Sequence, residues 1–166
     1  MMSEEAFQEF YQQTAVALRN YVARVLGSLT VADDIVQESF LRMLRYPPPI
    51  EEPQELRAYL FRIASNLIID GWHRQQRELA ATVDRPSLAA TGPDTALRLD
   101  MQRIFELLRR RERQLLWLAY VEGANHREIA AALGLRERSI RVLLSRAREK
   151  LARLIRSSGD HLGERR

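Results

Sequence analysis

Apolar residues recur every three or four positions along most of the chain, which is the spacing of one face of an α-helix. The first run extends from Phe7 to Leu26, and Gly27 is expected to end the helix because glycine readily adopts a left-handed conformation. A second run ends at Leu44, with Thr30 as a candidate capping residue. No segment alternates between apolar and polar residues as a half-buried strand would. The pattern therefore predicts an all-α fold.

Two breaks divide this helical pattern. Prolines at 47–49 and Pro53 interrupt it first, because proline lacks a backbone N–H and restricts the residue before it. A third helical run begins at Leu56. Residues 80–96 lose the periodicity and have a linker composition, and the pattern resumes at Leu97. We therefore predict two small helical domains, residues 3–80 and residues 96–157, joined by a flexible linker at residues 81–95.

The second predicted domain contains a helix-turn-helix pattern. Asn125 with Glu128 three positions later is typical of a capping box at a helix start. Three alanines at 130–132 would let another helix cross closely, and Gly134 supplies a turn. A longer helix then begins near Arg136. A short helix, a glycine-containing turn and a longer helix are the parts of a DNA-reading helix-turn-helix.

Charge is distributed unevenly along the chain, whose net charge is +4. Residues 1–60 carry five basic and nine acidic side chains, whereas residues 101–166 carry 16 basic and eight acidic ones. The basic half suits nucleic acid and the acidic half suits a protein partner. Residues 136–156 alone hold eight basic and two acidic side chains, although a solvated basic helix would share this composition. The candidate DNA-contacting residues are Arg138, Ser139, Arg141, Val142, Ser145, Arg146 and Arg148.

Several absences narrow the function. The chain has no cysteine, only three histidines, which are far apart, and seven glycines without a phosphate-binding loop. We therefore expect no disulfide, metal centre, cofactor, small-molecule substrate or catalytic site, and we expect that the protein is not an enzyme. No stretch approaches the roughly 20 apolar residues of a membrane helix, and the first residues lack a signal-peptide pattern. We accordingly expect neither a membrane-spanning nor a secreted protein.

Motifs in both halves resemble the bacterial extracytoplasmic-function sigma factors, the smallest members of the sigma-70 family. The resemblance covers about residues 5–156. The segments that carry it are ADDIVQESFLRML at 32–44, RAYLFRIASNLIIDGWHRQQR at 57–77, REIAAALGL at 127–135 and SIRVLLSRAREKL at 139–151. The proline-rich loop before residue 57 is most similar to the iron-starvation (ferric-citrate type) subgroup. Two motifs in the right order are more specific than a helix-turn-helix alone.

The resemblance implies a role in transcription initiation. The first domain would bind the clamp helices of the polymerase β′ subunit and the second the β flap. An acidic helix face would complement a basic surface of the polymerase, although an ordinary solvated helix face has the same character. The residues implied in core polymerase binding are Asp33, Asp34, Gln37 and Glu38.

The resemblance also implies two DNA contacts. The helix-turn-helix would read the promoter −35 element as duplex. In the first domain Asn66 matches a family position that hydrogen-bonds a flipped −10 base, and unstacked bases are held by such amide, aromatic and basic groups. Trp72 could instead belong to the core. The residues expected at the upstream edge of the melted DNA are Trp72, His73, Arg74 and Arg77.

The loop 47–54, which the resemblance places at the base pocket, departs from the commoner family loop with its glycine near an aromatic and an acidic residue, and the sequence departs from the family pattern in two further places. Leu143 stands where the recognition helix usually carries a basic residue, so either one DNA contact is missing or Leu143 packs inward. The arginine-rich segment 109–113 replaces a proline that usually precedes the next helix, and it could be solvated or bind polymerase or DNA.

The implied partners are core RNA polymerase, promoter DNA and a membrane-anchored anti-sigma factor. The implied location is the bacterial cytoplasm, with the protein held at the inner membrane while it is inhibited. A helix-turn-helix regulator that binds operator DNA without being a sigma factor is the main alternative, and a protein-only interaction module is another. The motif in residues 32–70 favours the sigma factor over the operator-binding regulator, and the net charge of +6 on residues 136–156 argues against the protein-only module.

Overall fold

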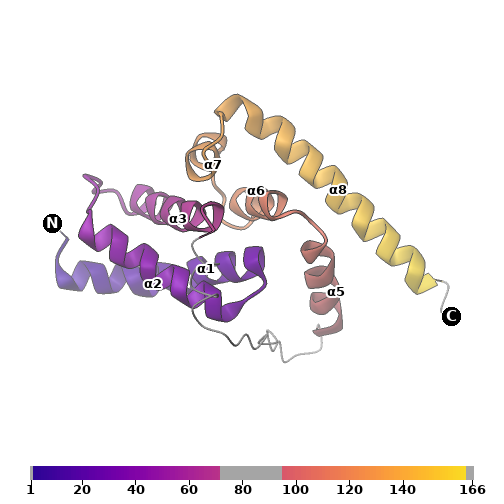
Figure 1. Cartoon of the computed structure of the whole chain (residues 1–166), viewed down its shortest axis with the longest axis horizontal. Helices are drawn as coiled ribbons and strands as arrows, with labels where there is room; N and C mark the ends of the chain where they lie inside the picture. The colour runs from indigo at the N-terminus through magenta and orange to yellow at the C-terminus, as the bar shows by residue number, and fades with distance from the viewer. Residues whose placement is uncertain (1, 72–94, 164–166) are drawn as a thin grey trace.

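The computed structural model describes residues 2–71 and 95–163, and this part of the chain is all helical (Figure 1). Its helices form two lobes, which confirms the predicted all-α fold with two helical domains. Thr95, predicted as the last linker residue, is the first residue of α5; residues 81–94 of the predicted linker lie outside the described residues. The first lobe contains α1 (Glu4–Leu26), α2 (Leu29–Arg45) and α3 (Pro53–Ile69), and the second contains α5 (Thr95–Glu106), α6 (Arg110–Tyr120), α7 (His126–Leu133) and α8 (Glu137–Gly163).

Local signals set the helix ends in the first lobe. Gly27 ends α1 in a left-handed conformation with φ 70°, as predicted. The cap of α2 is Ser28 and not Thr30, so that prediction is wrong: the Ser28 hydroxyl accepts a hydrogen bond from the Val31 N–H at 3.3 Å. Ser28 is extended and directly follows Gly27, so α2 starts early enough to place Thr30 inside its first turn. Pro53 opens α3, where its missing N–H costs no intrahelical bond.

The first lobe buries one apolar face from each of its three helices. Leu18, Ile35 and Leu60 are fully buried at the centre of this lobe, one from each helix. In the N-terminal half of α1, the ring of Tyr11 lies 4.8 Å from the ring of Phe40 of α2, measured between ring centroids. Burial of such side chains contributes about 1.5–3 kcal/mol each, so these contacts position the three helices.

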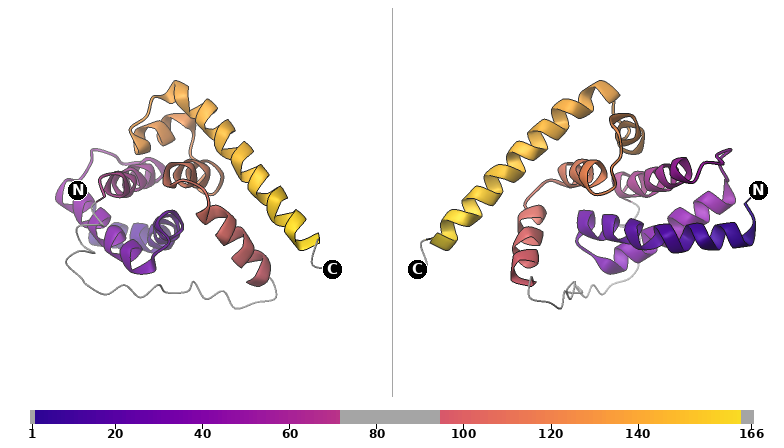
Figure 2. Two further views of the ribbon diagram at one scale, coloured as in Figure 1. Left: turned by 45° about the vertical axis from the view of Figure 1, so that its right-hand side comes forward. Right: turned by 180° about the vertical axis from the view of Figure 1, so that it is seen from behind.

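The second lobe is built around α6, α7 and the long helix α8. Ile140 and Leu144 of α8 are buried near its first turns, and Ala147 follows one turn later. Beyond this point α8 extends away from the body of the molecule beside α5, as Figures 1 and 2 show. A smaller apolar cluster joins these two helices to α6, with Leu108 and Leu116 buried.

The two lobes pack directly against each other. Helix α3 lies against α7, and α1 contacts α6, so the second lobe sits on the first in all three views (Figures 1 and 2). A single apolar cluster continues from the first lobe into Leu115, Leu118 and Ile129 of the second. The sequence predicted two lobes but did not predict that they share a core.

A series of buried side-chain hydrogen bonds crosses this junction. The Tyr21 and Ser65 hydroxyls are hydrogen-bonded at 2.7 Å, and the Gln114 side-chain amide donates to the Tyr21 oxygen at 3.3 Å. Each of the three residues is at most 1% exposed. Tyr21 and Ser65 belong to the first lobe and Gln114 to the second. Burial raises the pKa of Tyr21 to about 12, because an ionised phenolate would be poorly solvated there.

We predict that Tyr21 makes stability depend on pH in the alkaline range. Because burial raises the pKa of Tyr21 above its ordinary value of 10.0, its contribution is present below pH 10 and is lost as the pH rises toward 12. The expected loss is about 2–3 kcal/mol in the free energy of unfolding. Urea unfolding of the wild type and Tyr21→Phe between pH 8 and 12 measures it. The Phe variant should show a shallower decline, and parallel curves would contradict the prediction.

Candidate nucleic-acid interface

The helix-turn-helix forms from the predicted local signals. The Asn125 side chain accepts a hydrogen bond from the Glu128 N–H at 2.8 Å, and the Glu128 carboxylate accepts one from the Asn125 N–H at 2.9 Å. This confirms the capping box that starts α7. Gly134 ends α7 with φ 65°, a conformation that would strain any residue with a side chain. The turn therefore sets the angle at which α8 leaves.

Packing leaves one face of α8 exposed. Ile129 and Leu133 of α7 bury against Ile140 and Leu144 of α8, which fixes the rotation of α8 about its axis. The opposite face carries positions 138, 141, 142 and 145, which follow helical spacing and therefore lie together. The predicted DNA-contacting residues of this helix all keep solvent access: Arg138, Arg141, Val142, Arg146 and Arg148 are exposed, and Ser139 and Ser145 are half-buried.

An open hollow lies beside this face, between the first turns of α7 and α8. It is lined by His126, Arg136, Glu137, Arg138 and Arg141. His126 and Arg136 were not among the predicted contacts. The signal that could have identified them is their place at the start of the two helices, since the first helix of such a motif crosses the DNA backbone. Arg136 extends the basic surface around the exposed face of α8, and His126 adds ring nitrogens that can form hydrogen bonds.

Two departures from the family pattern have structural explanations. Leu143 is half-buried and packs against the core, so it lies inward from the positions predicted to contact DNA. In the segment 109–113, Arg113 donates a hydrogen bond to the Val25 carbonyl at 2.6 Å and another to the Leu108 carbonyl at 3.1 Å. Burial lowers the pKa of Arg113. Arg113 thus has a structural role at the lobe junction.

The predicted acidic face of α2 is exposed, but its carboxylates differ in their surroundings. Asp33 pairs with Arg19 at 2.6 Å, and Glu38 pairs with Arg42 at 2.7 Å. Asp34 makes no ion pair within the described part of the chain. Gln37 is exposed beside it, one turn further along α2. Asp34 and Gln37 are therefore the pair most available to a partner.

Apolar side chains extend this face of α2. Leu41 and Leu44 are each 51% exposed, and their spacing from Asp34 and Gln37 places all four on one stripe. Leu44 was expected among the buried positions of the helix, and the structure shows that it is not. It stands one residue after the buried Met43, and a helix turns about 100° per residue, which carries Leu44 to the edge of the buried face. An exposed stripe with acidic and apolar ends is typical of a protein-binding surface.

The second predicted DNA contact lies on α3. Asn66 is exposed, on a face of α3 different from that carrying Arg57 and Phe61, which point toward the second lobe. Its side chain is therefore open to solvent while the lobes are in contact. The other predicted contacts of this region, Trp72, His73, Arg74 and Arg77, lie outside the described residues.

Neither a metal cluster nor a membrane helix is found in residues 2–71 and 95–163. No three His, Asp or Glu side chains within these ranges come together as metal ligands would. None of the helices there combines the length and the apolar composition needed to cross a bilayer.

Comparison with known proteins matches each lobe to a described protein family. The family described as Sigma-70 region 2 matches residues 10–78, and the family described as Sigma-70, region 4 matches residues 98–151. RNA polymerase sigma factor CarQ of Myxococcus xanthus is 27% identical, over 92% of this chain and 91% of CarQ. ECF RNA polymerase sigma factor SigF of Caulobacter vibrioides is 29% identical, over 91% of this chain and 86% of SigF. Together the two family matches cover most of the chain, which belongs to the sigma-70 family and is similar to its extracytoplasmic-function (ECF) members. It is therefore a transcription initiation factor of the sigma-70 family and not an enzyme.

A third relative of this sigma factor is longer. RfaY of Xanthomonas campestris pv. campestris, named as a probable RNA polymerase sigma factor, is 30% identical over 85% of this chain. The chain spans 39% of the length of RfaY. The match to region 2 also decides between the readings left open by the helix-turn-helix, because an operator-binding regulator would not need that region.

Solved structures share the fold of this sigma factor. The sigma factor RpoE, crystallised with the anti-sigma factor NepR from Bartonella quintana, matches with a TM-score of 0.73 at 22% identity, over 90% of this chain and 96% of that one. CnrH, in complex with the cytosolic domain of CnrY, matches with a TM-score of 0.64 at 28% identity, over 93% and 90% of the two chains.

Proposed function

We propose that this sigma factor binds core RNA polymerase, reads the −35 element with α8 and captures an unstacked −10 base with α3. The observation that carries the proposal is that regions 2 and 4 occur in order in one chain, with Asn66 of α3 and with Arg138 and Arg141 of α8 exposed. The protein contributes contacts and strain to promoter opening, while the polymerase performs the phosphoryl transfer.

The first contact with polymerase is the exposed stripe of α2. Asp34 and Gln37 supply a carboxylate and an amide. Leu41 adds an exposed apolar side chain, whose burial against a partner would be favourable. The β′ clamp helices are the proposed partner, because a basic coiled-coil surface would complement this face. Asp33 and Glu38 would join the contact after releasing Arg19 and Arg42, and such exposed ion pairs are worth only about 0–1 kcal/mol.

The second contact with polymerase is proposed on α5. Leu97 is 66% exposed and Met101 is 40% exposed, and they lie one turn apart on this helix. An apolar strip of this kind suits the β flap as a partner, since burial of such side chains drives association. The two polymerase contacts therefore lie on different lobes.

The −10 contact is assigned to Asn66 and the residues that follow α3. An exposed side-chain amide offers both a donor and an acceptor to the edge of an unstacked base. The aromatic and basic residues Trp72, His73, Arg74 and Arg77 are proposed to stack on or neutralise the neighbouring DNA.

The −35 contact is assigned to the first turns of α8. Arg138 and Arg141 can each pair with two acceptors on a guanine edge, and Val142 can pack on a thymine methyl group. Arg146 and Arg148 are placed for bases or phosphates, with Ser139 and Ser145 at the edges of the face. Arg136 adds a positive charge, and His126 a hydrogen-bonding ring, where the DNA backbone would pass.

We also propose that an anti-sigma factor anchored in the inner membrane holds this cytoplasmic protein inactive. The complexes of similar proteins with NepR and with the cytosolic domain of CnrY support a regulatory partner. The proline-rich loop before α3 supports the iron-starvation subgroup, with iron limitation as the inducing signal. Constitutive transcription in cells, with no membrane protein captured by the tagged chain, would contradict this regulation.

Asp34→Arg is predicted to weaken binding to core polymerase. Charge reversal at an exposed position without an ion pair introduces repulsion from a basic partner. We expect a loss of about tenfold in affinity, which corresponds to about 1.4 kcal/mol, in fluorescence anisotropy with purified core enzyme. The matched control is Glu5→Arg, at an exposed position on α1. Equal affinities of the two variants would place the polymerase contact elsewhere.

Asn66→Ala is predicted to slow promoter opening and to leave core binding unchanged. Loss of the amide removes a hydrogen bond that forms only with an unstacked base, so the rate of opening should fall by about tenfold or more. Permanganate reactivity of −10 thymines, followed over time, measures opening. Asn20→Ala, an exposed asparagine on α1, is the control. Footprints that develop at the wild-type rate would refute the assignment.

Arg141→Ala is predicted to weaken binding to −35 DNA selectively. A bidentate arginine–guanine contact discriminates by about 1–3 kcal/mol, so promoter binding should fall while scrambled DNA is affected far less. Arg156→Ala, near the far end of α8, removes a charge away from the nominated face and should not change the ratio. An equal loss on both DNAs at matched salt would mean that Arg141 contacts only the backbone.

A further inference from the structure

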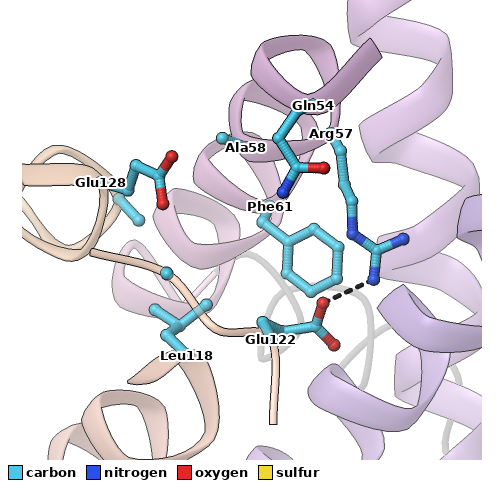
Figure 3. A pocket seen from close by; sticks show the side chains of 9 residues that line it. Gln54, Arg57, Ala58, Phe61, Leu118, Glu122 and Glu128 are labelled. Atoms are coloured by element: carbon cyan, nitrogen blue, oxygen red, sulfur yellow. Dashed lines mark hydrogen bonds and ion pairs between the residues drawn. The ribbon is translucent and has the colours of Figure 1, made fainter. Parts of the chain in front are cut away.

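The junction between the lobes is held by an ion pair that exists only while they touch. Arg57 of α3 donates to the Glu122 carboxylate at 2.6 Å, and the Glu122 side chain is only 9% exposed. Figure 3 shows this pair beside Phe61, with the Arg57 guanidinium carbon 5.2 Å from the centre of the ring. Without Arg57, the Glu122 carboxylate would remain largely buried and unpaired, which is strongly unfavourable.

Two further polar contacts cross the same junction. Gln114 reaches from α6 to the Tyr21 hydroxyl, which is bonded to Ser65. Arg113 reaches from α6 to the Val25 carbonyl at the end of α1. Each donor belongs to the second lobe and each acceptor to the first. Separation of the lobes therefore breaks the Gln114–Tyr21 and Arg113–Val25 bonds together, while the Tyr21–Ser65 bond stays within the first lobe.

The rest of the junction is only partly apolar. Phe61 and Leu118 meet there, but the hollow between α3 and the second lobe is also lined by Gln54 and Glu128 and by three alanines, Ala58, Ala124 and Ala132. Figure 3 shows Gln54 and Glu128 on opposite sides of this hollow. Opening also exposes part of the shared apolar cluster, and the polar groups that gain water on separation offset part of that cost, as in interfaces between domains that move.

The closed arrangement cannot reach two promoter elements at once. Elements named for positions 35 and 10 base pairs upstream of the start lie about 25 base pairs apart, which is roughly 85 Å of duplex. Helices α3, α7 and α8 pack in succession, at axis spacings of about 8–10 Å. Even α8, with 27 residues, is only about 40 Å long. Asn66 and Arg141 therefore lie too close together for simultaneous contact with the two elements.

We propose that this sigma factor inhibits itself through a latch between its lobes, formed by Arg57–Glu122, Gln114–Tyr21–Ser65 and Arg113–Val25. The free chain is closed without any partner, and core polymerase opens it by binding surfaces on both lobes. The 23 residues between Gly71 and Thr95 can span at most about 80 Å, so the covalent connection permits wide separation. The inhibitory role rests on the proposed function, whereas the latch itself rests on the contacts alone.

Charge reversal tests the latch directly. Arg57→Glu and Glu122→Arg each place like charges together and should raise the open population about tenfold, whereas the double variant R57E/E122R restores an ion pair and should close again. The chain has no cysteine, so spin labels at Val16→Cys on α1 and Arg156→Cys on α8 report the distance between the lobes in the full chain. Both positions are exposed.

The distance distributions decide the outcome. A narrow distribution in the parent chain, broadened toward long distances in both single variants and narrowed again in the double variant, supports the latch. A broad parent distribution, or single variants that match the parent, overturns it. Gln114→Leu keeps the size of the side chain and removes the bond to Tyr21, so it provides the same test if a charge reversal lowers the helix content measured by circular dichroism.

Polymerase binding separates the failure of the latch from the failure of the proposed function. If both hold, the single charge reversals should associate with core polymerase several-fold faster than the parent, and the double variant should return to the parental rate. A chain that opens on mutation but never binds polymerase keeps the latch and refutes the function. A chain that binds polymerase equally fast in all forms refutes self-inhibition.

Discussion

Helix α3 must be buried on two sides, and the rest of the structure depends on this constraint. Leu60 and Ile68 bury against α1 and α2, while Arg57 and Phe61 point toward the second lobe. Only a narrow strip of the helix then faces solvent, and Asn66 lies on it. The same helix thus anchors the core of region 2, supports region 4 and carries the residue assigned to an unstacked base. A change in its packing would affect all three.

The two lobes expose charges of opposite sign. The acidic groups of α2 face solvent on the first lobe, and the arginines of α8 face solvent on the second. A protein partner with a basic surface and a nucleic acid would be attracted to different ends of the chain. The contacts between the lobes combine a partly buried ion pair with a buried series of hydrogen bonds, which favours a specific closed arrangement over loose association.

Local chemistry made much of the fold predictable, because the signals lie within a few residues of each other. Gly27, Gly134 and the Asn125–Glu128 box act at helix ends, where backbone geometry decides the outcome. The cap of α2 was misassigned because Ser28 and Thr30 offer the same chemistry two residues apart. The exposed face of α8, with the residues proposed to contact DNA, followed from helical spacing together with charge.

Contacts between residues that are far apart in the chain could not be predicted from the sequence. Nothing in the spacing of Gln114 indicates that it meets Tyr21, 93 positions earlier, and Arg57 meets Glu122 across 65 positions. Leu44 fits an apolar helical pattern, yet the packing of α2 leaves it exposed on the stripe that is proposed to bind polymerase. The function could still be predicted from the family motifs, because they identify the two regions of a sigma factor without any knowledge of how these regions pack in space.

Transcription reconstituted from purified components tests the central claim most directly. The full chain is mixed with core polymerase, which lacks promoter specificity by itself, and with a library of random promoter templates. The account predicts transcripts that begin at defined positions on a subset of templates sharing two upstream elements. If no template in the library yields a specific start with the chain present, the assignment of this protein as a promoter-reading initiation factor is contradicted.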